Sequence, residues 1–221
     1  MEINMKFETI DVYGFDAAMS GMRNPLKSYH KADSVWTVNE TETDEIYEIG
    51  PNDYKLAKSL WKGGPEHRKW MRMVWVWVDI TAPRYWWSEF DTYKIGTAAN
   101  SESTMHTLLK EDFSRNQFEW PVFEGKDWDL EAVFKDYINN LKMARDRANA
   151  SPEEKEYYHK ILKSMLPEAF LQKRTVCLNY EVLANMYRQR KSHRLPQWNK
   201  YFVEWVKSLP YSEFITGDFD E

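Results

Sequence analysis

The segment KWMRMVWVWVDI, residues 69–80, limits the possible folds more than any other part of the chain. Its second half alternates β-branched residues with tryptophans, in the order Val74, Trp75, Val76, Trp77, Val78 and then Ile80. Successive side chains of a β-strand point to opposite faces of a sheet, so both faces of this strand carry large apolar groups. The pattern therefore predicts a central strand with both of its faces covered.

Other patterns predict the remaining helices and strands. Alternation over residues 6–13 and β-branched character over residues 173–179 indicate two more strands. Helical spacing with capping and stop residues indicates helices at about 15–22, 53–62, 84–93, 129–148, 151–165, 180–193 and 196–209. We expect a helical hairpin over about 129–165, and a single domain over residues 1–221 because no clear linker interrupts the chain.

Composition and charge exclude several classes of protein. The 30 basic and 35 acidic side chains give a formal net charge of -5, so no overall positive field attracts nucleic acid or anionic membranes. Cys177 is the only cysteine, which excludes an internal disulfide framework and cysteine-rich zinc sites. No apolar run approaches the roughly 18 residues of a membrane span. We therefore expect a cytoplasmic protein with no nucleic-acid partner and no membrane association.

The familiar catalytic patterns are absent from the sequence. The five histidines and one cysteine show no metal-ligand spacing, no nucleophile elbow and no HExxH helix. The eight glycines form neither a dinucleotide fingerprint nor a phosphate-binding loop. We expect no metal site, and these patterns identify no catalytic side chain.

Arg190 is the most informative of the remaining polar residues. In the predicted helix YEVLANMYRQR it follows Leu183, Met186 and Tyr187 by seven, four and three positions, so it shares their apolar face. A guanidinium on a core-facing stripe needs an anionic or carbonyl partner, which is either a ligand or one of the chain's acidic side chains. The neighbouring cations of RQRKSHR have a simpler explanation, because cations near a helix C-terminus complement the macrodipole in water.

Three further places offer hydrogen-bonding groups, each with a structural explanation beside the functional one. Asn179 precedes the same helix and fits an N-cap, whereas Asn185 lies in mid-helix, where an amide is disfavoured. Ser103 and Thr104 offer hydroxyls and main-chain amides suited to an anion, although a turn with a serine cap explains them equally well. His67 precedes the tryptophan-rich strand and is either structural or in contact with a ligand ring.

The order of these segments resembles that of the flavin-dependent thymidylate synthases, with gaps, from about residue 11 to about residue 215. The strongest similarity lies in LPEAFLQKRTVCLNYEVLANMYRQR, which keeps the family's Leu-Pro, two helix asparagines and an arginine at Leu166, Pro167, Asn179, Asn185 and Arg190. The segment SGMRNPLKSY is similar to the family's arginine followed by a serine and an aromatic residue, here Arg23, Ser28 and Tyr29.

The resemblance implies a mixed α/β (α+β) fold, with a mixed or antiparallel central sheet flanked by helices, assembled as a homotetramer. It implies binding of FAD and of a pyrimidine deoxynucleotide such as dUMP. The implied reaction transfers a one-carbon unit from a folate to uracil C5, with NADPH as reductant and no side-chain nucleophile. The implied flavin contacts are Ser28, His67, Lys94, Asn179 and Asn185, and the implied nucleotide contacts are Ser103, Thr104, Lys163 and Arg190.

The chain departs from the family at the signature itself. The usual Arg-His-Arg stands here as Thr92, Tyr93 and Lys94, and Glu181 replaces a common arginine beside Asn179. The family's two phosphate-side arginines stand here as Met105 and Lys163. Losing an arginine at a phosphate removes a charge-assisted contact of roughly 1.5–3 kcal/mol. The alternative is therefore a catalytically inactive oligomeric module that binds a nucleotide or a protein partner on the same scaffold.

Overall fold

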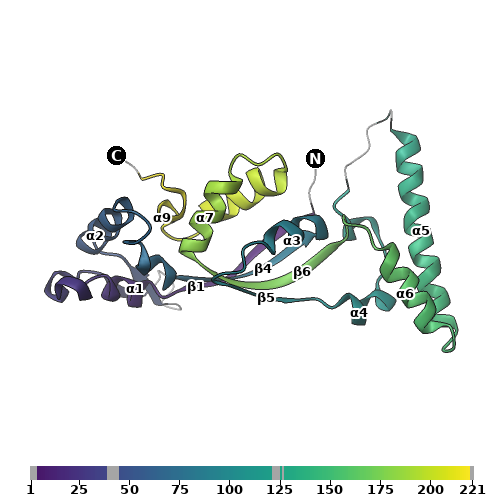
Figure 1. Ribbon diagram of the computed structural model, residues 1–221, viewed down its shortest axis with the longest axis horizontal. Coiled ribbons are helices and arrows are strands. Elements are labelled where there is room, and N and C mark those ends of the chain that lie inside the picture. Colours follow the sequence, from purple (N-terminus) through teal and green to yellow (C-terminus); the bar gives the residue numbers. More distant parts are fainter. Residues whose placement is uncertain (1–3, 39–44, 121–124, 126, 220–221) are drawn as a thin grey trace. The chain divides into compact units, whose positions relative to one another are not determined.

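The computed structural model describes residues 4–38, 45–120, 125 and 127–219, and combines β-sheets with helices (Figure 1). The larger sheet has the strand order β1-β4-β6-β5. Its strands are β1 (Lys6–Tyr13), β4 (Trp75–Pro83), β5 (Thr97–Ser101) and β6 (Leu171–Asn179). A smaller sheet pairs β2 (Val35–Val38) with β3 (Glu45–Glu48) in antiparallel register, with Trp36 opposite Tyr47.

The α-helices are α1 (Phe15–Gly21), α2 (Pro51–Lys62), α3 (Arg84–Phe90), α4 (Thr104–Thr107), α5 (Trp128–Ala150), α6 (Lys155–Met165), α7 (Tyr180–Arg190), α8 (Val203–Lys207) and α9 (Glu213–Thr216). A π-helical segment, Gln197–Phe202, precedes α8 within the region predicted as one helix. The predicted class, a mixed α/β fold with antiparallel pairing and flanking helices, is confirmed.

Strand β4 lies inside the larger sheet, as its sequence predicts, but its two faces differ. Val76, Val78 and Ile80 are buried, whereas Trp77 is 41% exposed. The prediction that both faces are covered is therefore wrong for the tryptophan face within the described residues. The strand also begins later than predicted, because Lys69–Arg72 form a short 3-10 helix that buries Trp70 and Met71 instead.

Packing divides the chain into two compact units. The first contains residues 1–6, 79–92 and 100–175, and the second contains residues 7–78, 93–99 and 176–221. The single domain expected from the sequence stays a prediction. Each unit has its own buried residues.

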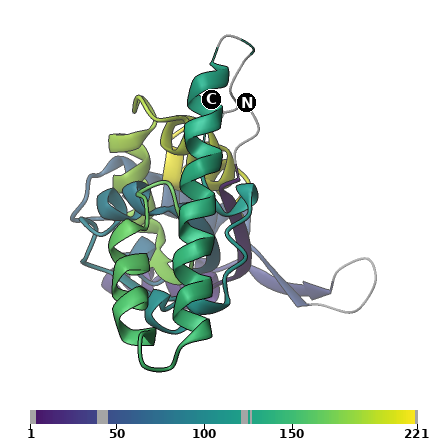
Figure 2. The same ribbon diagram turned by 90° about the vertical axis from the view of Figure 1, so that its right-hand side faces the viewer.

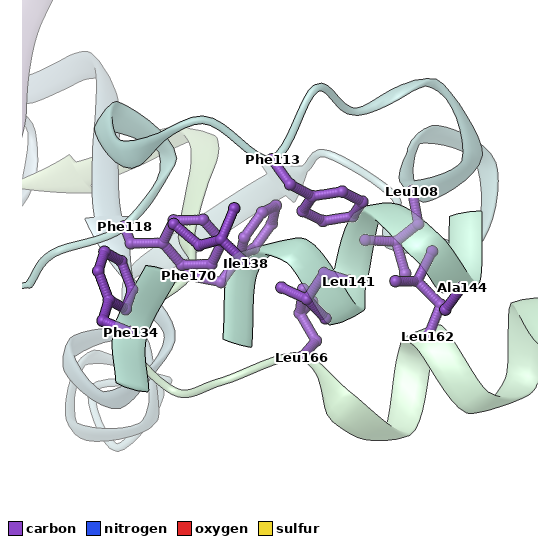
Figure 3. Packing of buried hydrophobic residues seen from close by; sticks show 10 residues of the cluster. All are labelled: Leu108, Phe113, Phe118, Phe134, Ile138, Leu141, Ala144, Leu162, Leu166 and Phe170. Carbon is purple, nitrogen blue, oxygen red and sulfur yellow. The ribbon is translucent and has the colours of Figure 1, made fainter. Parts of the chain in front are cut away.

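The first unit is built around the helices α5 and α6, which lie side by side in both views (Figures 1 and 2). They cover the region in which the sequence predicts a helical hairpin. One face of α5 packs with apolar residues from the segments before and after the two helices (Figure 3). This cluster consists of Leu108, Phe113, Phe118, Phe134, Ile138, Leu141, Ala144, Leu162, Leu166 and Phe170.

The second unit contains a buried ion pair that organises its N-terminal part. The Nε atom of Arg23 donates to Oδ1 of Asp53 over 2.6 Å, and the two side chains are 3% and 1% exposed. Arg23 also donates to the carbonyls of Ser28 and Lys31, at 3.2 and 2.9 Å. The pair therefore joins the segment after α1 to the start of α2.

No helix among the described residues is long and apolar enough to cross a membrane.

Candidate ligand-binding cavity

The second unit contains a cavity of about 890 Å³ beside α7. Its wall is formed by the end of α2, parts of the segment 65–75, residues 95–96, one side of α7 and residues 215–216. All of these segments belong to the second unit. The volume falls within the roughly 300–1,000 Å³ that small-molecule and cofactor sites occupy.

Asn179 and Asn185 both line this cavity, and the protein uses their amide oxygens. The Oδ1 atom of Asn179 accepts from the backbone N–H of Val182 over 3.0 Å, which makes Asn179 the N-cap of α7. The Oδ1 atom of Asn185 accepts from Arg188 and Gln189, at 3.0 and 2.9 Å. Neither amide nitrogen has a hydrogen-bond partner in the part of the chain that the structure describes. Both asparagines therefore keep donors for a ligand.

Gly96 brings its loop close to the start of α7. Its φ of +75° lies in the left-handed region, and a Cβ atom at this position would lie 2.9 Å from Nδ2 of Asn179 and 3.0 Å from Cγ2 of Val182. Only glycine fits without displacing a side chain. The loop and the helix N-terminus thus form one continuous part of the cavity wall.

The charged side chains of the wall are mostly cationic. Among the described lining residues, the cations are Arg68, Arg72, Arg188 and Lys191, and the one carboxylate is that of Glu181. Two indole rings, Trp61 and Trp75, also line it. Amide donors, indole rings and an excess of cations together suit a ligand that has an aromatic ring and phosphates.

Arg190 is half-buried and contacts aromatic side chains. Its Nε atom donates to the hydroxyl of Tyr93 over 2.9 Å, and its guanidinium carbon lies 4.7 Å from the centre of the buried Trp198 ring. The hydroxyl of Tyr93 in turn donates to Gln189 over 3.0 Å. Arg190 is not among the described residues that line the cavity beside α7. The sequence predicts that Arg190 shares the apolar face of its helix and needs a partner there. The Trp198 ring and the Tyr93 hydroxyl are two such partners in the structure.

The other three predicted flavin contacts, Ser28, His67 and Lys94, are not among the described residues that line the cavity. Ser28 accepts through its carbonyl from Arg23, and its side chain is half-buried. His67 is exposed, with Nε2 3.9 Å from Glu66, and Lys94 is exposed immediately before the lining residue Ile95. Of the five predicted flavin contacts, the structure brings only Asn179 and Asn185 together on the wall, as judged from the described residues.

The predicted phosphate contacts lie in the first unit. Lys163 donates through Nζ to the hydroxyl of Thr104, so the structure brings these two residues together. The carbonyl of Ser103 accepts from the backbone N–H groups of His106 and Thr107, at 2.9 and 3.1 Å, as at a helix start. Ser103 itself is exposed.

Sequence reasoning missed the cations of the cavity wall. From the sequence, the run containing Arg188 and Lys191 is interpreted as a solvated helix end. No function is predicted for Arg68 and Arg72. The sequence does offer one signal. Arg68 follows His67 directly and Arg72 comes four residues later, just before the tryptophan-rich strand. That spacing has a meaning only once α7 is known to pack beside the same segment.

Solved structures of other proteins have the same fold. A crystal structure of thymidylate synthase X (ThyX) from Helicobacter pylori with FAD and dUMP is 17% identical, with 95% of each chain covered and a TM-score of 0.68. A second Helicobacter pylori structure of flavin-dependent ThyX, also complexed with FAD and dUMP, is 16% identical, with a TM-score of 0.69 over 97% of this chain and 100% of that one. The chain has the fold of the flavin-dependent thymidylate synthases.

A further protein shares this thymidylate synthase fold. The UMP/dUMP methylase PolB from Streptomyces cacaoi, bound with 5-Br dUMP, is 16% identical, with a TM-score of 0.59 over 97% of this chain and 95% of that one. No protein-family model and no curated protein matches the sequence. The resemblance inferred from the sequence is thus confirmed for the fold, at an identity too low to transfer activity.

Proposed function

We infer that the chain is a divergent thymidylate synthase-like protein that binds FAD in the cavity beside α7 and also binds a pyrimidine deoxynucleotide such as dUMP. One observation supports this most. Asn179 and Asn185 line a nucleotide-sized cavity, and their amide nitrogens have no partner among the described residues. Amide donors of this kind bind the carbonyl oxygens of a flavin ring or the oxygens of a phosphate.

Each predicted residue has a role in this proposal. Asn179 and Asn185 hold the flavin from the cavity wall, and Ser28, His67 and Lys94, which are not among the described lining residues, are proposed as further flavin contacts. FAD, when bound, would supply the hydride that reduces the transferred carbon. Folate as carbon donor, NADPH as reductant and the homotetramer belong to the same proposal.

The nucleotide contacts are proposed on Arg190 for a base carbonyl and on Ser103, Thr104 and Lys163 for the phosphate. The hydrogen bond between Lys163 and Thr104 keeps a cation beside the loop hydroxyl, which favours an anion there. Nucleotide binding at Arg190 has to displace or share its bond to Tyr93.

The first experiment measures binding. The purified protein is examined for a flavin absorption band, titrated with FAD, and then titrated with dUMP. We expect saturable binding of both. A protein that takes up neither ligand would remove the proposal.

The second experiment assigns the amide donors. Asn179→Asp keeps the acceptor that caps α7 but replaces the amide donor by an oxygen, and Asn185→Asp makes the same change in mid-helix. Each substitution should weaken FAD binding about tenfold with little loss of thermal stability. Asn140→Asp on the exposed surface of α5 is the control and should bind as the wild type does. Equal affinity in all four proteins would reject the role given to α7.

The inactive module remains a second candidate, and one contact favours it. Tyr93 stands where the family signature has its histidine, and its hydroxyl is bonded to Arg190. Release of tritium from [5-³H]dUMP in the presence of FAD, NADPH and methylene folate separates the two candidates. Release supports the enzyme, whereas tight dUMP binding without release supports the module.

A further inference from the structure

Four cationic side chains line the cavity, and none of them forms an ion pair with an acidic residue in the described part of the chain. Elsewhere in the chain, arginines and lysines such as Arg23, Lys173 and Arg174 form ion pairs with carboxylates. Within the described residues, no such pair involves the wall cations Arg68, Arg72, Arg188 and Lys191. Positive charge that the fold does not neutralise, gathered around a cavity, attracts an anionic ligand.

Arg68 is held in place by the protein. Its guanidinium carbon lies 4.1 Å from the centre of the Trp61 ring, and its Nε atom donates to the Trp61 carbonyl over 2.9 Å. Its two terminal nitrogens have no partner in the ranges that the structure describes. A stacked guanidinium with both terminal NH₂ groups open is the arrangement that binds phosphate oxygens bidentately, with little ordering cost on binding.

The other three cations add charge from two places, the C-terminal end of α7 and the 3-10 helix Lys69–Arg72. Arg188 lies on α7 and donates to Asn185 over 3.0 Å, Lys191 follows the same helix, and Arg72 is exposed on the 3-10 helix. The macrodipole of α7 accounts for Arg188 and Lys191. It does not account for Arg68, which directly precedes the 3-10 helix Lys69–Arg72 and is oriented by Trp61.

We propose that the cavity binds the diphosphate of its ligand, with Arg68 as the fixed phosphate contact and with Arg72, Arg188 and Lys191 supplying further charge. The ligand class is a nucleoside or flavin diphosphate, whose ring has the wall indoles Trp61 and Trp75 to contact. The inference rests on the proposed function in treating the cavity as a nucleotide site. It assigns the phosphates to residues that the sequence resemblance does not mark.

Glu181 sharpens the inference because it is the one carboxylate among the described lining residues. Its Oε2 atom is buried and has no hydrogen-bond partner in the described part of the chain. A carboxylate near a diphosphate repels it. Glu181→Gln should therefore tighten diphosphate binding by a few-fold, in the direction opposite to removal of a cation.

The test is isothermal titration of the full chain with ADP, AMP, inorganic pyrophosphate, FAD and riboflavin. We expect ADP to bind more tightly than AMP, and FAD more tightly than riboflavin. Affinity for ADP should fall as KCl is raised. Arg68→Gln should weaken ADP, pyrophosphate and FAD about 10- to 100-fold and leave riboflavin unchanged. Arg68→Lys, which keeps the charge but loses the fork, should be intermediate.

Arg194→Gln is the matched control, since Arg194 is exposed and lies outside the described cavity wall. It should bind every probe as the wild type does. If Arg68→Gln does not fold, the double variant Arg72→Gln/Arg188→Gln, at two exposed positions, tests the supporting cations, and it should weaken ADP, pyrophosphate and FAD but not riboflavin.

The outcomes separate this inference from the proposed function. If FAD binds equally well to wild type and Arg68→Gln, the diphosphate site is wrong although the flavin proposal stands. If pyrophosphate and ADP bind through Arg68 but neither FAD nor dUMP binds, the proposed function fails and the diphosphate site stands. Absence of binding to every phosphate probe, or ADP no tighter than AMP, overturns the inference.

Discussion

The polar loop at residues 101–104 and the wall of the cavity beside α7 use their hydrogen-bonding groups in opposite ways. In the loop, Glu102 and Lys173 exchange two hydrogen bonds of 3.0 Å, and Thr104 is bonded to Lys163. On the cavity wall, the amide nitrogens of Asn179 and Asn185 have no partner among the described residues. Glu102 and Thr104 of the loop are bonded within the fold, whereas the amide nitrogens on the cavity wall are open.

The difference shows that hydrogen-bonding groups in two regions of one protein serve different ends. A polar group bonded within the protein stabilises the fold, and a ligand that takes it over has to replace that bond. A polar group with no partner contributes nothing to the fold and gains its full hydrogen bond only with water or a ligand. Substitutions of the first kind should lower stability, and substitutions of the second kind should lower affinity.

Substitution of Asp53 should have the largest effect on stability, because both of its carboxylate oxygens accept hydrogen bonds. Its two carboxylate oxygens accept from Arg23, from the backbone N–H groups of Asp33 and Ser34, and from the Ser34 hydroxyl. Asp53→Ala leaves Arg23 buried without its partner, so it should lower the free energy of unfolding by about 3–5 kcal/mol. Urea denaturation measures this, with Asp136→Ala on the surface of α5 as control. A loss as small as that of the control would contradict the assignment.

The same carboxylate gives a dependence of stability on pH. Burial opposes ionisation of Asp53, but the bonds from Ser34, Asp33 and Arg23 outweigh it and hold its pKa below the ordinary value. Because the unfolded chain binds the proton more readily, this stabilisation is complete above the pKa of the unfolded chain and declines as pH falls through that of the folded chain. Thermal unfolding below about pH 4 should show the decline, and Asp53→Asn should flatten it. An equally steep decline in Asp53→Asn would assign it to other groups.

Gly96 lies on the cavity wall, so its substitution tests that region. Gly96→Ala places a Cβ atom in the left-handed region and against Asn179 and Val182, so we expect a loss of about 1–3 kcal/mol in stability. FAD affinity should fall as well, because the added carbon disturbs the cavity wall beside Asn179. Gly125→Ala is the matched control, since nothing lies within 4 Å of its added carbon. An alanine variant that keeps wild-type stability and affinity would show that the loop adapts.

The smallest expected effect on stability is at the closed loop. Lys163 is exposed, so Lys163→Met should change the free energy of unfolding by less than about 1 kcal/mol. If the loop binds the nucleotide phosphate as proposed, dUMP affinity should fall about tenfold. Lys160→Met on the same helix should change neither quantity. Unchanged dUMP affinity in Lys163→Met would show that the contact with Thr104 is structural alone.

Local sequence patterns predicted much of the scaffold. The alternation at residues 74–80 identified an inner strand, and Asn179 was predicted as an N-cap because a cap depends on bonds within four residues. The order of segments also pointed to the thymidylate synthase fold. The exposure of Trp77 escaped prediction, because alternation shows that a face is apolar but not whether another element covers it.

The residues that surround the cavity follow from tertiary contacts instead. Arg68 acquires an orientation only because the Trp61 ring packs beneath it, and Gly96 acquires a requirement for glycine only because the start of α7 lies against it. Hydrogen bonding over three or four residues can be recognised along the chain. Whether a distant side chain satisfies a charge or leaves it open depends on which segments the fold brings together, and it is this that separates the cavity wall from the closed loop.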